Sequence, residues 1–215
     1  MDKDTRFKPT VGGLDGPTSV AVIKKTSKLT FKQKVQKIRY KIKRTCVERK
    51  IKPESHSMDE VMEYIINKYD FVELDKSMVE QEYKEMRASL LMQQAADLLG
   101  EYGIMPQLKS ESREDIQAYL QKFQEIKQRA MDIPTAEFDI DFHKFQSIYE
   151  GDENDMYITI EKRFSYIGGG VSGNKKMVKR FQRIYKDIHK FYGVTREDIE
   201  NKSKRYEQLV RALTR

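Results

Sequence analysis

Apolar residues recur every three or four positions over most of the chain between residues 31 and 130, a pattern typical of helices that bury one face. The first such segment, about 31–50, follows Thr30, a residue type that caps helix N-termini, and ends before Pro53. We expect its apolar stripe to lie in the core. The stripe consists of Phe31, Val35, Ile38, Ile42 and Cys46.

Three further helices are predicted before residue 134. Ser57-Met58-Asp59-Glu60 and Ser77-Met78-Val79-Glu80 fit the capping box, in which a Ser side chain and a Glu three residues later satisfy each other's backbone N–H groups. A third segment starts near Ser112 and ends before Pro134. We interpret the methionines and aromatic residues of these segments as core packing.

From Ala136 the period changes to two. Phe138, Ile140 and Phe142 alternate with polar residues, and the run 156–160 alternates again after the acidic segment 150–155, which indicates a β-hairpin with an acidic tip. Two helices follow, the first capped by Asn174 and the second beginning at Thr195.

The first thirty residues differ from the rest. Glycines, Asp-Gly and Gly-Pro between Gly12 and Pro17 predict a turn, and the β-branched run 18–23 suits a strand, so we expect a short extended arm or hairpin. The predicted fold is α+β and mainly helical, with about six helices, the N-terminal arm and a C-terminal β-hairpin. The expected organisation is an arm at 1–30, a helical region at 31–134 and a hairpin with two helices at 135–215, and the last two regions can also form one continuous domain.

Composition narrows the class of protein. Hydrophobic residues make up 38% of the chain and Phe and Tyr are plentiful, which predicts a folded protein. Cys46 is the only cysteine, so no intrachain disulfide can form. The charged N-terminal residues do not resemble a secretion signal, and the apolar runs are far shorter than the roughly 20 residues that span a bilayer. We therefore expect a soluble, cytoplasmic protein.

The charge of the chain is strongly segregated. Residues 24–52 contain thirteen Lys/Arg and one acid, Glu48; residues 53–161 carry a net charge of −15, and residues 162–215 carry +10. Two explanations compete: the acidic middle neutralises the basic segments, or the basic segments share a face that binds an external polyanion. The candidate anion-binding residues are Lys32, Lys34, Lys37, Arg39, Lys41, Lys43, Arg44, Lys175, Lys176, Lys179, Arg180 and Arg183.

A glycine-rich segment before Asn174 is a candidate phosphate-binding loop, because it is expected between a strand and a helix, where backbone N–H groups favour anions. Its glycines are Gly168, Gly169, Gly170 and Gly173. The segment departs from a nucleotide-binding P-loop, since Asn174 stands where the lysine would be and no Ser or Thr follows Lys175-Lys176. The alternatives are incidental anion binding and a plain turn.

Metal and catalytic signals are weak. His56, His143 and His189 are widely separated, and Cys46 lies within an apolar stripe. Carboxylates are so abundant in the middle of the chain that no acid/base pair stands out. The sequence therefore predicts neither a metal site nor a cofactor, and a binding protein is the favoured interpretation over an enzyme.

The segment 11–20, VGGLDGPTSV, resembles the GG-x-DGPT-S signature of the beta subunit of sodium-ion-translocating decarboxylases. In that family the segment interrupts a membrane helix, and the resemblance implies a role in sodium or proton binding for Asp15. It covers about ten of the 215 residues; Leu14 replaces the usual small residue, and the apolar membrane helices of the family have no counterpart here. The matching residues are Gly12, Gly13, Asp15, Gly16, Pro17 and Thr18.

Three functions remain open on these grounds. The favoured one is a non-catalytic protein that engages nucleic acid through its basic helices, with nearby tyrosines available for stacking. The second is a regulator that docks on an acidic protein, including a decarboxylase complex of the kind the segment 11–20 resembles. An anionic membrane surface is a less favoured partner for the first helix, and a nucleotide-binding enzyme is the least favoured function. The oligomeric state is not predicted.

Overall fold

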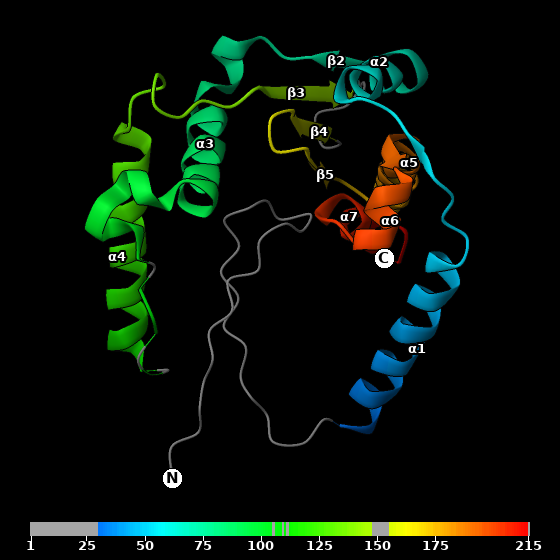
Figure 1. The fold of residues 1–215 in the computed structure, drawn as a ribbon, viewed down its shortest axis with the longest axis horizontal. Helices are drawn as coiled ribbons and strands as arrows, with labels where there is room; N and C mark the ends of the chain where they lie inside the picture. Colours follow the sequence, from blue (N-terminus) through cyan, green and yellow to red (C-terminus); the bar gives the residue numbers. More distant parts are fainter. Residues whose placement is uncertain (1–29, 105, 109, 111, 148–154, 215) are drawn as a thin grey trace. The chain divides into compact units, whose positions relative to one another are not determined.

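The computed structural model describes residues 30–104, 106–108, 110, 112–147 and 155–214 (Figure 1). The chain divides into two compact units, and the chain passes from the second unit to the first and back. Among the described residues, unit 1 contains 75–142, and unit 2 contains 30–74 and 143–214. The helical region expected at 31–134 is therefore shared between both units.

An antiparallel four-stranded sheet with the order β2-β3-β4-β5 lies in unit 2. The strands are β2 (Phe71–Glu73), β3 (Phe142–Ser147), β4 (Asp155–Glu161) and β5 (Tyr166–Ser172). The expected C-terminal hairpin is thus wrong in extent. Phe138 and Ile140 are buried but precede β3, and the segment 156–160 pairs with β5, in register from Asp155↔Ser172 to Glu161↔Tyr166.

Helices α2 (Met58–Tyr69), α5 (Lys175–Tyr192) and α7 (Lys204–Thr214) complete the core of unit 2. α5 packs on β5, α2 and α7. Strand β1 (Glu54–Ser55) pairs with β6 (Gly193–Val194) and so ties the start of α2 to the end of α5. Val194 is fully buried with Tyr206, Leu209 and Val210, and this cluster holds α7 in position.

Helix α1 (Phe31–Glu48) contacts α7, and Arg44 in its C-terminal part bonds Glu207 of α7. Thr30 caps it with a complete capping box, as predicted. No residue of α1 is buried, however, so the prediction that the Phe31–Cys46 stripe forms part of the core is wrong.

Unit 1 is helical. Its elements are η1 (Lys76–Val79) and η2 (Ala96–Gly103), both 3-10 helices, and the α-helices α3 (Glu80–Gln94) and α4 (Arg113–Asp132). α3 and α4 pack together. Arg87 of α3, 2% exposed, donates hydrogen bonds to the backbone carbonyls of Phe138, Met131 and Ile133 and so ties the segment after α4 to α3.

Most helices begin at the residues that the sequence predicts, and one does not. Ser57, Ser112, Asn174 and Thr195 cap α2, α4, α5 and α6 (Arg196–Asn201) as predicted. The box at Ser77 is wrong, because Asp75 caps η1 there and α3 begins only at Glu80. The last expected helix is two helices, since Lys202 adopts a left-handed conformation between α6 and α7. None of the described helices is long and apolar enough to cross a membrane.

Candidate anion-binding surface

Helix α5 carries a row of cations along one side. At 100° per residue, the positions 175, 179, 183, 186 and 190 fall within an arc of about 80° and extend over about 22 Å of helix. Lys186 is half-buried and the other four are exposed, while Phe181, Ile184 and Ile188 lie buried on the opposite side. The α5 row, as we call it, consists of Lys175, Lys179, Arg183, Lys186 and Lys190.

The C-terminal end of the α5 row opens onto a pocket of about 560 Å³ in unit 2. Lys186 and Lys190 line it from α5, and Lys50 and Lys52 line it from the segment that follows α1. Its apolar wall consists of Val47, Ile51, Leu209 and Leu213, and among the described residues Glu54 is the one acid in its lining. The pocket thus combines an apolar wall with four lysines from both basic segments of the sequence.

The cations around this pocket are not paired with carboxylates in the part of the chain that the structure describes. Within the described part of the chain, none of the α5-row residues, nor Lys43, Lys50 or Lys52, forms an ion pair with a carboxylate. Burial, then the positive charges of Lys43 and Lys190, lower the pKa of Lys186. A bound anion would relieve that repulsion.

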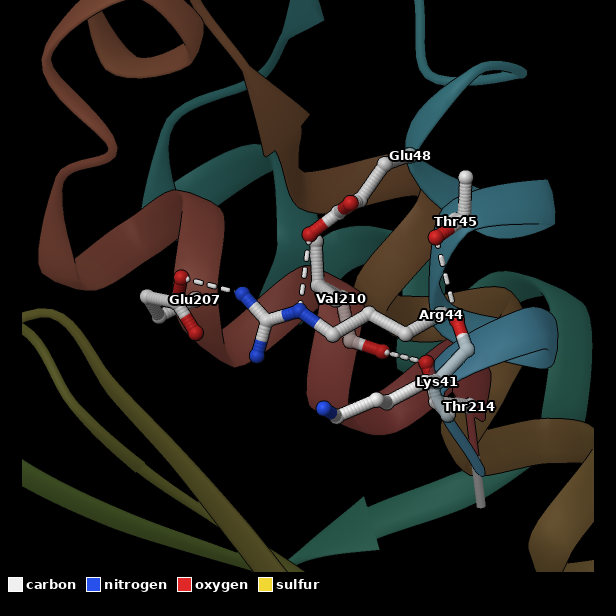
Figure 2. A network of polar contacts seen from close by, with 7 residues as sticks. All are labelled: Lys41, Arg44, Thr45, Glu48, Glu207, Val210 and Thr214. Atoms are coloured by element: carbon white, nitrogen blue, oxygen red, sulfur yellow. Dashed lines mark hydrogen bonds and ion pairs between the residues drawn. The ribbon is translucent and has the colours of Figure 1, made fainter. Parts of the chain in front are cut away.

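Arg44 is a predicted anion-binding residue on α1 that pairs with carboxylates of the protein itself. Its Nε donates to Glu48 Oε1 at 2.7 Å, and one terminal nitrogen donates to Glu207 Oε1 of α7 at 2.6 Å (Figure 2). Hydrogen bonds from Arg44 to Glu207 and Glu48 raise the pKa of the guanidinium. Arg44 therefore fixes the end of α1 to α7, and its charge is already compensated.

The other predicted cations on both helices are exposed to solvent. On α1 these are Lys32, Lys34, Lys37, Arg39, Lys41 and Lys43, and on α5 they are Lys175, Lys176, Lys179, Arg180 and Arg183. The structure places Lys43 of α1 near enough to Lys186 of α5 for its charge to lower the pKa of Lys186. The N-terminal arm with Gly12, Gly13, Asp15, Gly16, Pro17 and Thr18 lies outside the described residues.

The prediction that Gly168, Gly169 and Gly170 lie in a phosphate-binding loop is wrong. Gly168, Gly169 and Gly170 belong to strand β5 and pair with Thr159, Ile158 and Tyr157, so their backbone groups form a ladder instead of a phosphate cradle. Asn174 also satisfies the first N–H groups of α5, those of Lys176 and Met177.

Side chains explain why glycine occupies these strand positions. A Cβ on Gly170 would lie 2.6 Å from the hydroxyl oxygen of Tyr157, and one on Gly168 would lie 2.6 Å from that of Tyr166. A Cβ on Gly169 would lie 2.5 Å from the backbone oxygen of Tyr157. The tyrosines therefore cover the strand at its glycines, a packing device known from other sheets. Gly173, at φ 134°, follows the strand in a conformation that favours glycine.

The three histidines occupy separate environments in unit 2. His56 Nδ1 lies 2.6 Å from the carbonyl oxygen of Phe191, and His143 Nδ1 lies 2.6 Å from Glu73 Oε1. Burial lowers the pKa of His189 to about 4. Among the described residues, no group of three or more His, Cys, Asp or Glu side chains is arranged to hold a metal ion.

Charge separates between the two units. The described residues of unit 2 include 26 Lys/Arg and 14 Asp/Glu, whereas those of unit 1 include 7 and 13. The described residues of both basic segments belong to unit 2, and those of the acidic middle, 53–161, carry a net charge of −6 in each unit. Within unit 2, the basic segments share a surface.

Sequence reasoning left Lys50, Lys52, Lys186 and Lys190 out of the candidate site. Lys186 and Lys190 continue the helical spacing of Lys175, Lys179 and Arg183, so the periodicity of the sequence is enough to place all five on one side of the helix. Lys50 and Lys52 belong to the basic segment 24–52, but no local pattern predicts their place beside α5, which depends on the pairing of β1 with β6.

Comparison with known proteins gave no match: no family model, no curated protein and no solved structure is similar to the chain.

Proposed function

We propose that the protein is a non-catalytic binding protein that engages the phosphate backbone of a nucleic acid through the α5 row and the lysines of the adjoining pocket. The observation that carries the proposal is that, among the described residues, Lys43, Lys50, Lys52 and the α5 row form no ion pair with a carboxylate, although they come from two distant segments and meet near Lys186. Lysine and arginine contacts to phosphates supply most of the affinity in sequence-independent nucleic-acid binding.

The shape of the α5 row supports a long ligand over a small one. The row extends over about 22 Å, which corresponds to roughly six nucleotides of one strand at about 3.4 Å per nucleotide. A single small phosphate compound would contact only the end near Lys186 and Lys190, leaving Lys175, Lys179 and Arg183 without a role. A polyanion accounts for the whole row.

The test compares two triple variants that remove the same charge. Lys179→Gln/Arg183→Gln/Lys190→Gln removes three cations of the α5 row, and Lys76→Gln/Arg113→Gln/Lys122→Gln removes three exposed cations of unit 1. Fluorescence anisotropy with labelled single- and double-stranded oligonucleotides at low salt measures affinity. We expect the α5 variant to lose roughly tenfold or more in affinity, and the unit 1 variant to bind like the wild type.

The outcome also separates the alternatives. Equal losses in both variants would show that only net charge matters and would contradict a defined surface. No binding of the wild-type protein to either oligonucleotide would end the nucleic-acid proposal and favour docking on an acidic protein.

A further inference from the structure

Helix α1 presents its apolar stripe away from the rest of unit 2. Arg44 and Val47 face the body of the unit, since Arg44 bonds Glu207 of α7 and Val47 lines the pocket with Leu209. Ile42 is two residues before Arg44, which places it about 200° away around the helix. The stripe is therefore on the side of α1 opposite to α7.

The stripe is exposed to an extent that is unusual for such side chains. Phe31 is 83% exposed, Ile38 57% and Ile42 59%. Single exposed apolar residues are common on protein surfaces, but these three recur at helical spacing on one side of α1, with the half-buried Val35 between Phe31 and Ile38. Removing these three side chains from water would be favourable, and this requires an apolar surface that covers them.

Cations border the stripe on both sides. By helical position, Lys34, Lys37 and Lys41 lie on one side and Lys32, Arg39 and Lys43 on the other, and no acid occurs from residue 31 to residue 47. All six cations are exposed. An apolar line with three cations on each side is the arrangement of a helix that lies in the plane of a membrane surface, with its long basic side chains reaching the headgroups.

We infer that α1 docks on an anionic lipid surface, with Ile38 and Ile42 inserted below the headgroups and the flanking cations bound to them. A nucleic-acid backbone would satisfy the cations but would leave the apolar line in water. Each cation near an anionic bilayer surface adds about fivefold in affinity. The inference goes beyond the proposed function, because it uses the apolar stripe of α1 and not the α5 row; Lys43 is the cation that both surfaces share.

The chain contains no tryptophan, so a single introduced tryptophan reports on one position. Ile38→Trp places the probe on the apolar line, and Gln36→Trp places it about 200° around the helix, on the side away from the line. Each variant is mixed at low salt with vesicles of phosphatidylcholine alone or of phosphatidylcholine with phosphatidylglycerol. Circular dichroism first checks that both variants keep the helical content of the wild type.

We expect the emission of Ile38→Trp to shift to shorter wavelength on the anionic vesicles alone and to become protected from an aqueous quencher, while Gln36→Trp stays accessible. Ile38→Ser/Ile42→Ser should bind anionic vesicles roughly tenfold or more weakly. No shift, an equal shift at both positions, or an equal shift on neutral vesicles would overturn the inference. So would an Ile38→Trp shift produced by oligonucleotides or an acidic protein but not by lipid.

The α5 triple variant separates this inference from the proposed function. In the Ile38→Trp background it should lose oligonucleotide affinity and keep the blue shift on anionic vesicles. Loss of the blue shift together with oligonucleotide binding would assign both activities to one surface and contradict a separate lipid-docking helix.

Discussion

Lys186 holds a positive charge in surroundings that disfavour it. It is half-buried, and Lys43 and Lys190 are close enough to lower its pKa further. A half-buried charge that binds no anion costs folding free energy, which an uncharged side chain at this position would not. Among the cations of the proposed site, Lys186 is therefore the one whose charge a bound anion would stabilise most directly.

His189 gives a prediction for stability against pH. Its side chain is 3% exposed, and Nε2 has no hydrogen-bond partner among the described residues. Because burial lowers its pKa from 6.5 to about 4, the imidazole is neutral in the folded protein and binds a proton on unfolding in mild acid. Its contribution is therefore complete above pH 6.5 and is lost as the pH falls towards 4, by about 3 kcal/mol in total.

Urea unfolding at a series of pH values measures this effect. His189→Gln removes the titrating group, so the variant should lose less stability than the wild type between pH 6.5 and pH 4. Parallel pH profiles for the two proteins would show that His189 does not titrate as described.

Asp187 gives a second prediction at the same scale. Its Oδ2 accepts hydrogen bonds from the hydroxyls of Tyr64 and Tyr69 at 2.6 Å and from Lys68 Nζ at 2.7 Å, and so it links α5 to α2. Burial alone would raise the pKa of Asp187, but these three donors outweigh burial and lower it to about 2. Because the carboxylate is partly exposed, we expect Asp187→Ala to cost about 1–2 kcal/mol of unfolding free energy.

The matched control for this variant is Asp59→Ala. Asp59 also pairs with a lysine, Lys162, at 2.7 Å, but its side chain is 65% exposed and no tyrosine donates to it in the described contacts. Chemical denaturation should show a loss below about 1 kcal/mol for Asp59→Ala. Equal losses for the two variants would mean that the tyrosine hydroxyls add nothing.

Strand β5 makes a prediction at the scale of an element. A Cβ on Gly169 would meet the backbone oxygen of Tyr157, which is fixed in the sheet, whereas a Cβ on Gly170 would meet the outer end of the Tyr157 ring, which can rotate away. Gly169→Ala should therefore destabilise the protein by about 1–3 kcal/mol, and Gly170→Ala by less. Thermal unfolding of the two variants gives the comparison.

A double variant checks the reason for the difference. Replacing Tyr157 by Ala should remove most of the cost of Gly170→Ala, since the ring is the obstacle, and leave the cost of Gly169→Ala unchanged. A Gly170→Ala cost that persists without the ring would contradict this account of the glycines.

Local signals predicted the elements well where the cause is local. Thr30, Ser57, Ser112, Asn174 and Thr195 all cap helices, because a hydrogen bond from a backbone N–H to a nearby side chain depends on a few adjacent residues. The strand at 166–172 was missed, because glycines there predict a loop until Tyr157 on the neighbouring strand is known. Pairing of β2 with β3, more than seventy residues apart, likewise has no local signal.

Helical periodicity predicts the apolar stripe on α1 but does not predict that the stripe is exposed. Helical spacing shows that Phe31, Ile38 and Ile42 share a side, and an apolar side is usually buried. The bond from Arg44 to Glu207 turns the Arg44 side of α1 towards α7, so the stripe faces away from the rest of unit 2. Glu207 is 163 positions further along the chain, so no local pattern predicts this orientation. The candidate cations lie on α1 and α5, but nothing in the sequence indicates the pocket that lies beside them.

At the scale of the whole molecule, the sign of the charge follows the division into units. The described residues of both basic segments belong to unit 2, whose described residues carry a net charge of +12, against −6 for those of unit 1. The described part of the acidic middle, 53–161, carries −6 in each unit, so both explanations raised by the sequence can be met within unit 2. A shared basic surface needs only contacts within unit 2, and Lys43, Lys186 and Lys190 provide them.

The most direct test is the salt dependence of nucleic-acid affinity, measured for the wild type and the two triple variants. For double-stranded DNA, log K should fall linearly with log salt concentration, and each phosphate contact contributes about 0.9 to the slope. The α5 variant lacks three contacts, so its slope should be shallower by about 2.7, whereas the unit 1 variant should keep the wild-type slope. A wild-type affinity that is absent or independent of salt, or slopes that change equally in both variants, would contradict the account.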